Sequence, residues 1–288
     1  MTQEQIKLLP SDEDVDFYRR HGYYITDKIL PEALLDAALA GTERFYAGDA
    51  DRDPPAGSTP GWKPEDGAHV LRKNDFASFQ LDEFSALVRY PLLAAAAARL
   101  VGEPVRLWAD QLLYKPPDGP ETEANVGWHI DRKYWQCCTS TDMLTAWIPF
   151  RDCGETEGTV TVIDGSHQWP DNTGNLDFRT QDLDELESRF NTGSQPVVKT
   201  PIVIRRGQVS FHHCRTIHGS GANRSDSPRI ALAVHLQGAS NRWREYVYRM
   251  PDGSIRKHDV EVLCRKKNGV PDFTDPAICP QLWPREDL

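Results

Sequence analysis

Most of the chain after residue 102 is divided into short stretches in which side chains alternate between two faces. Residues 105–112 alternate with a period near two, which predicts a β-strand. Many short strands without intervening helices indicate an antiparallel sandwich or barrel. Further runs of this kind, separated by clusters of Gly, Pro, Asn and Asp, occupy 144–150, 158–163, 202–204, 208–212 and 229–237.

The first 102 residues carry helix signals instead. Residues 11–14 form a capping box for a short helix that ends by Gly22, and a strand candidate follows at 23–30. Pro31 begins a second helix that extends to about residue 46, because the apolar residues after it form one stripe. Pro91 and Gly102 bound a third, alanine-rich helix. We therefore predict a helical layer that precedes the strands.

No internal repeat or linker divides the chain, so we expect one domain over 1–288. Its expected parts are a mostly helical N-terminal layer (1–102), a β core (103–240) and a C-terminal extension (241–288). Residues 48–67 carry Pro, Gly and Asp at high density without apolar periodicity, which predicts a surface loop or flap.

Composition argues against several classes of partner. The net charge of −10 and the absence of a long Lys/Arg run argue against nucleic acid. No stretch approaches the roughly 20 consecutive apolar residues of a membrane-spanning helix, and residues 1–10 lack a signal peptide's apolar core. The six cysteines form no C-x-x-C pair, which favours free thiols in a reducing compartment. We therefore expect a cytoplasmic protein, and no feature predicts its oligomeric state.

One short motif has the spacing of a metal site. His129 and Asp131 are two residues apart, so in an extended chain their side chains point to the same side and can share one ion. The later segment 211–220 contains three histidines that offer candidates for a third ligand. Two histidines and one carboxylate on one face of an octahedron leave three positions open, which suits ferrous iron, a bidentate 2-oxo acid and dioxygen.

A 2-oxo diacid also needs a fixed cation for its far carboxylate, and Arg229 supplies one. A guanidinium meets a carboxylate with two parallel hydrogen bonds, whereas lysine offers a point charge. Residues 219–228 are rich in turn formers, so Arg229 begins the return strand of a hairpin that can bring it beside the metal.

An ordered set of motifs extends from residue 128 to Arg229, 11 residues after His218. H-x-D alone is a weak signal, but the ordered set is specific, and residues 17–30 add an opening helix and strand. On these residues the chain resembles the phytanoyl-CoA dioxygenase family of iron and 2-oxoglutarate oxygenases over most of its length. The matching motifs are Trp128-His129-Ile130-Asp131 with Tyr134-Trp135, Trp147-Ile148-Pro149-Phe150, Ile163-Asp164-Gly165-Ser166-His167, Gly207-Gln208-Val209 and His218-Gly219-Ser220-Gly221-Ala222-Asn223-Arg224-Ser225.

The resemblance implies a mainly β protein whose core is a double-stranded β-helix, the jelly roll shared with cupins, with the helical layer at its N-terminus. It implies that His129, Asp131 and His218 are the metal ligands and hold Fe(II). It also implies that Arg229 binds the 5-carboxylate of the co-substrate 2-oxoglutarate.

The resemblance assigns weaker roles to three more residues. Ser220 and Trp147 are expected close to 2-oxoglutarate, and Lys73 is a candidate at its other end, although a solvated surface lysine explains Lys73 equally well. Trp147 read alone could be ordinary core, since aromatic side chains dominate core area.

The implied reaction uses O2 to decarboxylate 2-oxoglutarate to succinate and carbon dioxide while it oxidises a small-molecule substrate. We expect hydroxylation of a specialised metabolite or of an acyl or amino-acid derivative, with specialised metabolism preferred because the sequence shows no peroxisomal tail. Asp131 favours oxygenation over halogenation, because related halogenases carry a small residue at that position.

Three residues near the H-x-D motif are candidate substrate contacts. Arg132 and Lys133 follow Asp131 directly, and either they form an exposed pair on a loop or they meet a polar or anionic substrate group at the pocket mouth. Trp135 is a further candidate that could equally be core. His212 and His213 point to opposite faces of their strand, so one of them can approach the site, and we predict neither as a ligand.

Three alternative functions stay open. The same cofactor chemistry can end in desaturation, epimerisation, cyclisation or endoperoxide formation, and the sequence does not choose among these outcomes. A catalytically silent cupin-like binding protein is expected to lack a ligand or the arginine, and neither is missing here. A zinc hydrolase needs a general base beside a tetrahedral site, for which there is no motif.

Overall fold

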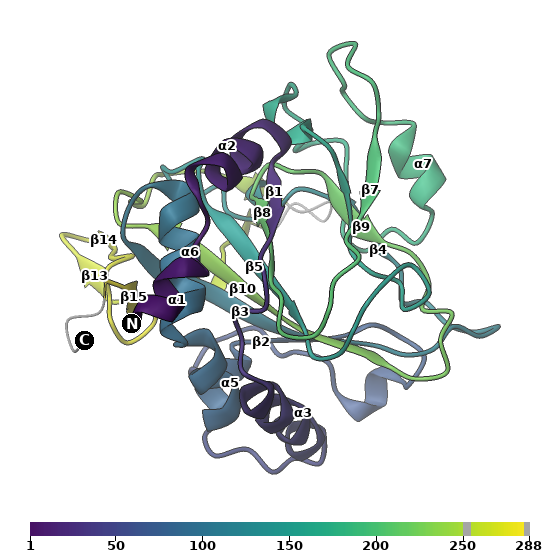
Figure 1. The fold of residues 1–288 in the computed structure, drawn as a ribbon, viewed down its shortest axis with the longest axis horizontal. Helices are drawn as coiled ribbons and strands as arrows, with labels where there is room; N and C mark the ends of the chain where they lie inside the picture. The colour runs from purple at the N-terminus through teal and green to yellow at the C-terminus, as the bar shows by residue number, and fades with distance from the viewer. Residues whose placement is uncertain (250–254, 285–288) are drawn as a thin grey trace.

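The computed structural model describes residues 1–249 and 255–284. Its core consists of two antiparallel sheets (Figure 1). The larger sheet has the order β1 (Tyr23–Ile25), β8 (Ser210–His213), β5 (Leu144–Pro149), β10 (Arg229–Gly238), β3 (Val105–Lys115) and β15 (Gln281–Trp283), and β2 (Arg72–Asp75) also pairs with β3. The smaller sheet has the order β4 (Val126–His129), β9 (His218–Ser220), β6 (Thr161–Ile163) and β7 (Lys199–Pro201).

The two sheets pack face to face over an apolar cluster. Trp147, Ala231 and Ala233 of the larger sheet contact Val162 of the smaller sheet in this cluster. Strands that are neighbours in space are distant in sequence, as in β1–β8 and β4–β9. This arrangement is the predicted mainly β jelly roll. The metal motif lies between its two sheets.

Helices cover the outer face of the larger sheet (Figure 1). Most of them precede β3, as the helix signals predict, and the capping box of Ser11 and Asp14 opens α2, which Gly22 ends at φ 76°. The helices are α1 (Gln3–Lys7), α2 (Asp12–His21), α3 (Glu32–Tyr46), α4 (Ala77–Gln80), α5 (Asp82–Val88), α6 (Pro91–Val101), α7 (Leu183–Glu187) and α8 (Asp259–Leu263), with short 3-10 turns at η1 (Pro64–Asp66), η2 (Asp131–Lys133) and η3 (Ser166–Gln168).

The α5–α6 segment, Asp82–Val101, is the one helical stretch in the described ranges that is long and apolar enough to cross a membrane by length and composition. Its mean hydropathy is 1.4, and 61% of it is buried inside the protein. Leu92, Leu93 and Ala96 belong to the cluster between the helices and the larger sheet, so packing against that sheet accounts for its apolar character.

Alternation along β5 and β10 divides their side chains between the two faces. In β10, Leu232 and Val234 pack under the helices, whereas Ala231 and Ala233 face the smaller sheet. Because side chains two residues apart share a face, Arg229 and His235 lie on the inner side with Ala231 and Ala233. In β5 the same alternation places Thr145 and Trp147 inside.

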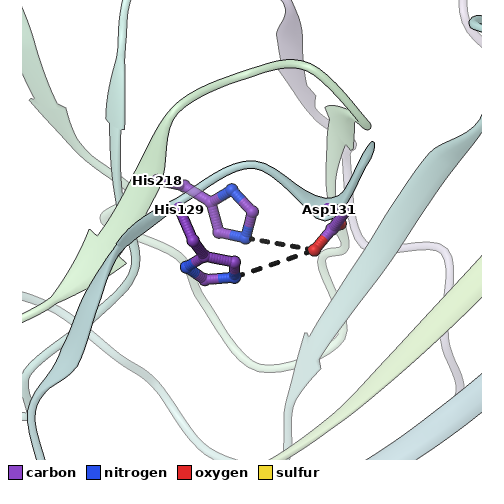
Figure 2. A group of neighbouring side chains, drawn as sticks. All are labelled: His129, Asp131 and His218. Atoms are coloured by element: carbon purple, nitrogen blue, oxygen red, sulfur yellow. Dashed lines mark ion pairs between the residues drawn. The ribbon is translucent and has the colours of Figure 1, made fainter. Parts of the chain in front are cut away.

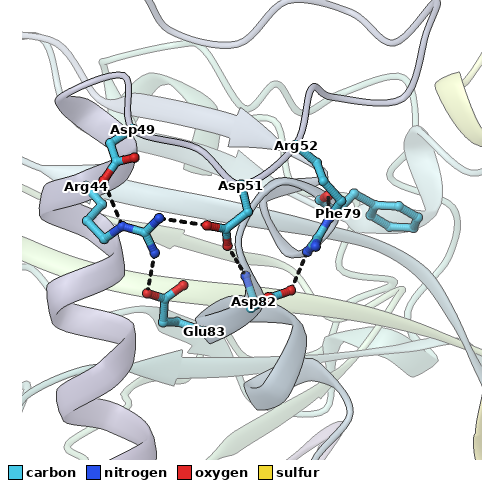
Figure 3. A network of polar contacts seen from close by, with 7 residues as sticks. All are labelled: Arg44, Asp49, Asp51, Arg52, Phe79, Asp82 and Glu83. Carbon is cyan, nitrogen blue, oxygen red and sulfur yellow. Dashed lines mark hydrogen bonds and ion pairs between the residues drawn. The ribbon is translucent and has the colours of Figure 1, made fainter.

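An ion-pair network fixes the start of the 48–67 segment against α5 (Figure 3). Arg44, at the end of α3, bonds Asp49, Asp51 and Glu83 at 2.6–3.0 Å. Arg52 pairs with Asp82 at 2.6 Å and donates to the Phe79 carbonyl. Beyond this network the segment contains one 3-10 turn, which agrees with the predicted loop.

Several predicted strands have different bounds. The expected strand 23–30 is only three residues long, and that expected at 158–163 begins at Thr161. The prediction of a strand at 202–204 is wrong: pairing with β6 is made by β7 instead, and Ile204 forms only an isolated bridge to Cys153. The C-terminal extension adds two short antiparallel strand pairs, β11 (Tyr248–Arg249) with β12 (Ile255–Arg256) and β13 (Lys266–Lys267) with β14 (Val270–Pro271).

Candidate metal centre and co-substrate pocket

Three buried side chains converge on one point between the sheets (Figure 2). Oδ1 of Asp131 lies 3.7 Å from Nε2 of His129 and 3.7 Å from Nε2 of His218. The three ligand atoms all lie within 4.8 Å of one another. Divalent metals bind such N and O donors at about 2.0–2.2 Å, so one ion fits between them.

Two strands and a turn produce this convergence. His129 and His218 are direct partners across β4 and β9, which places both imidazoles on the same face. Ile130 is still extended, and Asp131 then begins the η2 turn, whose Arg132 amide donates to the Cys214 carbonyl at 2.8 Å. The H-x-D spacing therefore works as predicted, although its carboxylate comes from a turn that follows the strand.

Backbone carbonyls orient both imidazoles. Nδ1 of His129 bonds the Gly127 carbonyl at 2.8 Å, and Nδ1 of His218 bonds the Thr216 carbonyl at 3.0 Å. A carbonyl only accepts, so each Nδ1 carries the proton and each Nε2 presents its lone pair to the common point. Burial lowers the pKa of both histidines, which keeps the rings neutral at pH 7.

The carboxylate of Asp131 is ionised in this environment. Burial acts to raise the pKa of Asp131, but the nearby His218, His212 and His235 together hold it well below its ordinary value. Oδ2, the oxygen that does not face His129 and His218, accepts a hydrogen bond from Thr145 Oγ1 at 2.6 Å. Oδ1 of Asp131 is thus available to a cation, whereas Oδ2 is hydrogen-bonded to the protein.

Arg229 lies in an inner cavity beside these ligands. The cavity is lined by His129, Asp131 and His218 on one side and by Arg229, Ser220 and Trp147 on the other. Arg229 is 5% exposed, and its Nε and Nη2 have no hydrogen-bond partner among the described residues. Its guanidinium lies 5.6 Å from the centre of the Trp147 ring. A buried guanidinium without an anion is costly, so this cavity is built for a carboxylate or similar group.

Lys115 is a second buried cation that sequence reasoning missed. It is the direct partner of Arg229 across β3 and β10, and it is fully buried. Its Nζ donates to Ser220 Oγ at 2.6 Å and to the carbonyls of Ser220 and Gly221 at 3.1 and 2.5 Å. Burial, and then the charge of Arg229, lowers the pKa of Lys115. A lone lysine at a strand end gives no signal in a sequence, because its role depends on strand register.

A larger outer cavity of about 660 Å³ opens from the metal ligands. This volume is in the range that accommodates an organic molecule of drug-like size. Aromatic side chains and polar groups share its surface, and His129 and Asp131 lie at its inner end. Its aromatic lining residues are Phe76, Tyr134, Trp135, Phe178, Tyr246 and Tyr248.

The weaker site candidates fall in different places. Lys73, Lys133 and Trp135 line the outer cavity, and Lys73 is bound there to Asp75 at 2.6–2.8 Å. The structure does not bring Arg132 to either cavity. Its guanidinium instead donates to the carbonyls of Trp135 and Cys138, so it braces the loop after η2.

Thr145 of β5 and His235 of β10 were also missed, whereas His212 of β8 is the one of the His212–His213 pair that approaches the site. His212 has both ring nitrogens without a hydrogen-bond partner among the described residues, and its Nε2 lies 3.5 Å from Oδ2 of Asp131. Thr145 bonds both Asp131 and His235. Alternation offered one signal, since His235 follows Arg229 by an even number of residues in a predicted strand. His213 faces away, as the opposite-face argument predicts for one of the pair, and its Nδ1 accepts from the Arg215 amide.

Comparisons with known proteins agree with this geometry. The model of the family "Phytanoyl-CoA dioxygenase (PhyH)" matches residues 18–231. A Stutzerimonas stutzeri protein named "Probable alpha-ketoglutarate-dependent hypophosphite dioxygenase" is 28% identical over 60% of this chain and 59% of its own length. The ectoine dioxygenase of Bordetella bronchiseptica is 28% identical over 80% of this chain and 76% of its own. The chain thus spans less than two thirds of the length of the first of these relatives.

Two solved structures share the fold. The non-haem alpha-ketoglutarate-dependent carbocyclase SnoK from nogalamycin biosynthesis has a TM-score of 0.63 and 28% identity, over 81% of this chain and 86% of that one. The epimerase SnoN, crystallised with Fe3+, alpha-ketoglutarate and a nogalamycin compound, has a TM-score of 0.64 and 25% identity over the same shares. Alpha-ketoglutarate is another name for 2-oxoglutarate, so the predicted cofactors, iron and 2-oxoglutarate with O2, are confirmed at the level of these relatives.

Proposed function

We propose, since the chain belongs to the phytanoyl-CoA dioxygenase family, that it hydroxylates a small organic molecule with Fe(II), 2-oxoglutarate and O2, releasing succinate and carbon dioxide. One observation carries the proposal. Three metal-type donors and an unpaired, buried guanidinium face the same inner cavity, so a divalent cation and a dianionic co-substrate each have a complementary partner there.

In this proposal His129, Asp131 and His218 hold the iron, and the donor set fits the ion. Two neutral imidazoles and one carboxylate give a facial set with open positions, which is typical of non-haem ferrous sites. The bound iron supplies the oxidising chemistry, in which O2 and 2-oxoglutarate are consumed together. Asp131 supports oxygenation over halogenation, since its Oδ1 occupies the place that halide would need.

The protein's own groups position the co-substrate. Arg229 forms two parallel hydrogen bonds to the 5-carboxylate, with the Trp147 ring as one wall. Ser220 accepts a hydrogen bond from Lys115 through its Oγ, which leaves its own O–H proton free for the same carboxylate. These buried groups also exclude water from the inner cavity.

The substrate lies in the outer cavity, whose inner end contains His129 and Asp131. We assign Lys133 and Trp135 as contacts there. Lys73 is bound to Asp75 on the wall of this cavity, so we place it beside the substrate and not beside Arg229. Aromatic walls with scattered polar groups favour a ring-bearing specialised metabolite over a simple acyl chain.

A second outcome has specific support. SnoK is described as a carbocyclase and SnoN as an epimerase, so ring closure or epimerisation at the same site is the alternative to hydroxylation. Product analysis separates these outcomes: hydroxylation adds one oxygen atom to the substrate, cyclisation removes two hydrogens, and epimerisation leaves the mass unchanged.

The wider setting is part of the same proposal. We propose that residues 1–288 act as one domain, with the helical layer 1–102 supporting the core 103–240, and that the protein works in the cytoplasm on a small molecule, independently of nucleic acid and membranes. The extension 241–288 contributes Tyr246 and His258 to the outer cavity, so it belongs to the substrate site.

Anaerobic titration with Fe(II) and 2-oxoglutarate tests the function. The wild-type protein is expected to develop the weak visible charge-transfer band of the iron–2-oxo acid chelate. Asp131→Ala should abolish the band, and Arg229→Ala should shift its appearance to much higher 2-oxoglutarate concentrations. A folded wild-type protein that never develops the band contradicts the proposal, and it would favour a silent binding protein.

A further inference from the structure

Three strands of the larger sheet place a row of polar side chains directly beneath the metal ligands. His212 of β8 is paired with Thr145 of β5, and Thr145 is paired with His235 of β10. All three are buried, at 2%, 1% and 5% exposure. Polar groups this deep require partners, and Asp131 is the group they surround.

Two short contacts connect the row to the carboxylate. Thr145 Oγ1 lies 2.6 Å from Oδ2 of Asp131 and 2.7 Å from Nδ1 of His235. His212 is not the direct holder, since its Nε2 lies 3.5 Å from the same oxygen and makes no hydrogen bond to it. The threonine hydroxyl is therefore the link between Asp131 and His235.

Counting protons fixes the direction of this chain. An ionised carboxylate only accepts hydrogen bonds, so the single Thr145 proton points to Oδ2 of Asp131. The Thr145 oxygen must then accept from His235, which places the imidazole proton on Nδ1. In a neutral ring this leaves Nε2 as an acceptor. His235 lines both the inner and the outer cavity, and its Nε2 has no partner within the described part of the chain.

We infer that Thr145 and His235 are positioning residues for the metal centre, and that their hydrogen-bonded chain presents Nε2 of His235 to the outer cavity as a fixed acceptor. The inference rests on the proposed function and deepens it. Thr145 keeps Oδ1 of Asp131 turned toward the metal, and His235 keeps the threonine rotamer. Substrates recognised by this cavity carry an O–H or N–H group near the reacting carbon, because an acceptor cannot pair with a carbonyl or an ether.

Anaerobic Fe(II) affinity tests the role of Thr145. Thr145→Val keeps the shape and removes the hydroxyl, and it is expected to weaken Fe(II) binding by about 10–100-fold, as loss of a hydrogen bond to a metal ligand typically does. Thr145→Ser should bind Fe(II) nearly as the wild type does. Thr159→Val is the matched control, since Thr159 is also buried and donates to a carbonyl, that of Ile202, away from the metal ligands. An unchanged affinity in Thr145→Val, or an equal loss in Thr159→Val, overturns the inference.

Substitutions of His235 test the second link. Asparagine can place an amide N–H near the position of Nδ1, so His235→Asn should retain most of the Fe(II) affinity that His235→Leu loses. Nitrogen NMR of the Zn(II)-loaded protein then shows the tautomer directly. A proton on Nδ1 with an unprotonated Nε2 supports the inference, and a proton on Nε2 contradicts it.

Failure of the inference is distinguishable from failure of the function. If the wild type forms the iron–2-oxoglutarate band but Thr145→Val binds Fe(II) normally, the function stands and the positioning role falls. If the wild type forms no band but Thr145→Val still weakens Fe(II) binding, the metal site is real and the oxygenase assignment falls.

Discussion

His129 and His218 are direct partners across β4 and β9, and their ring centroids lie 4.1 Å apart. The two neutral imidazoles are tilted by 49° to each other, and each is held in place by a backbone carbonyl behind it. A cation bound between them and Asp131 links two strands and the η2 turn, so metal binding is coupled to the stability of the smaller sheet.

Divalent metal should therefore raise the melting temperature of the wild type and not that of His218→Ala. Binding at about 100 times the dissociation constant stabilises a folded protein by about 2.7 kcal/mol, which corresponds to several degrees for a chain of this size. Differential scanning fluorimetry with and without Zn(II) measures the shift. His213→Ala is the control, because His213 faces away from the site and should keep the full shift; a shift that survives in both variants would indicate metal bound elsewhere.

Arg229→Lys should weaken 2-oxoglutarate binding by about 10–100-fold although it keeps the positive charge. Lysine replaces two parallel hydrogen bonds with a point charge, and a charge-assisted hydrogen bond contributes about 1.5–3 kcal/mol. The measurement is the 2-oxoglutarate dependence of the charge-transfer band at saturating Fe(II). Arg224→Lys, at an exposed arginine in the connection between β9 and β10, should leave that dependence unchanged. Equal affinities for Arg229→Lys and the wild type would show that the guanidinium does not contact the co-substrate.

The residues predicted from sequence are those whose evidence is local. The capping box of α2 and the Pro91–Gly102 bounds of α6 depend on neighbouring residues, and both predictions agree with the structure. H-x-D spacing is also local, since two alternating positions share a side. His218 and Arg229 were within reach because family motifs mark both and only a short connection separates them. That connection leads from β9 of the smaller sheet to β10 of the larger sheet, so the predicted hairpin is wrong.

The residues that were missed depend on strand register. Lys115, Thr145 and His235 come from strands β3, β5 and β10, and each becomes part of the site only through pairing with a strand that is distant in sequence. Alternation predicts which face a residue occupies but not which residue lies opposite. The contacts of Arg132 were out of reach for a related reason: its position beside Asp131 was evident, but the two carbonyls that bind its guanidinium come from the fold of the following loop.

Ser220→Ala should raise the KM for 2-oxoglutarate by about tenfold with little change in Fe(II) affinity. Lys115 donates to the Ser220 oxygen, so the serine proton is directed to another acceptor, and the co-substrate carboxylate is the one the inner cavity would hold. Loss of one hydrogen bond to a charged group costs about 1.5 kcal/mol or more. Steady-state succinate release measures KM. Ser225→Ala, whose hydroxyl bonds only within the turn, is the control and should behave as the wild type.

The metal-free protein should lose stability as pH falls from about 6.5 to about 4. Burial lowers the pKa of His235 to about 4 and that of His258 to about 3, while an unfolded chain returns both to about 6.5. The unfolded state therefore binds more protons in this window, so the free energy of unfolding rises with pH through it and falls on acidification. Urea denaturation at a series of pH values measures the slope.

His258→Asn should flatten that slope. Nδ1 of His258 accepts from the Val260 amide at the start of α8, and asparagine is a good residue at this capping position that does not titrate. A slope identical to that of the wild type would show that His258 is not buried as a neutral ring.

Gly127→Ala should disrupt the metal site from outside it. A Cβ at residue 127 would lie 2.1 Å from the Asp177 carbonyl oxygen and 2.7 Å from that of Thr180, and both atoms are backbone that cannot rotate away. The 177–180 segment must therefore move, and it carries Phe178, whose ring packs against His129 at 5.0 Å between centroids. Overpacking of this kind typically costs about 1–3 kcal/mol of unfolding free energy.

The Gly127 carbonyl is also the acceptor that fixes the His129 imidazole, so a shift of this strand should weaken Fe(II) binding as well as stability. Gly174→Ala is the matched control: Gly174 also lines the outer cavity, but an added Cβ there meets nothing within 4 Å. Urea denaturation and anaerobic Fe(II) titration of both variants separate the two effects. Gly127→Ala could instead lose stability and keep full Fe(II) affinity. That result would show that the Gly127 carbonyl has no part in orienting the His129 imidazole, which the cation and Asp131 alone would then hold.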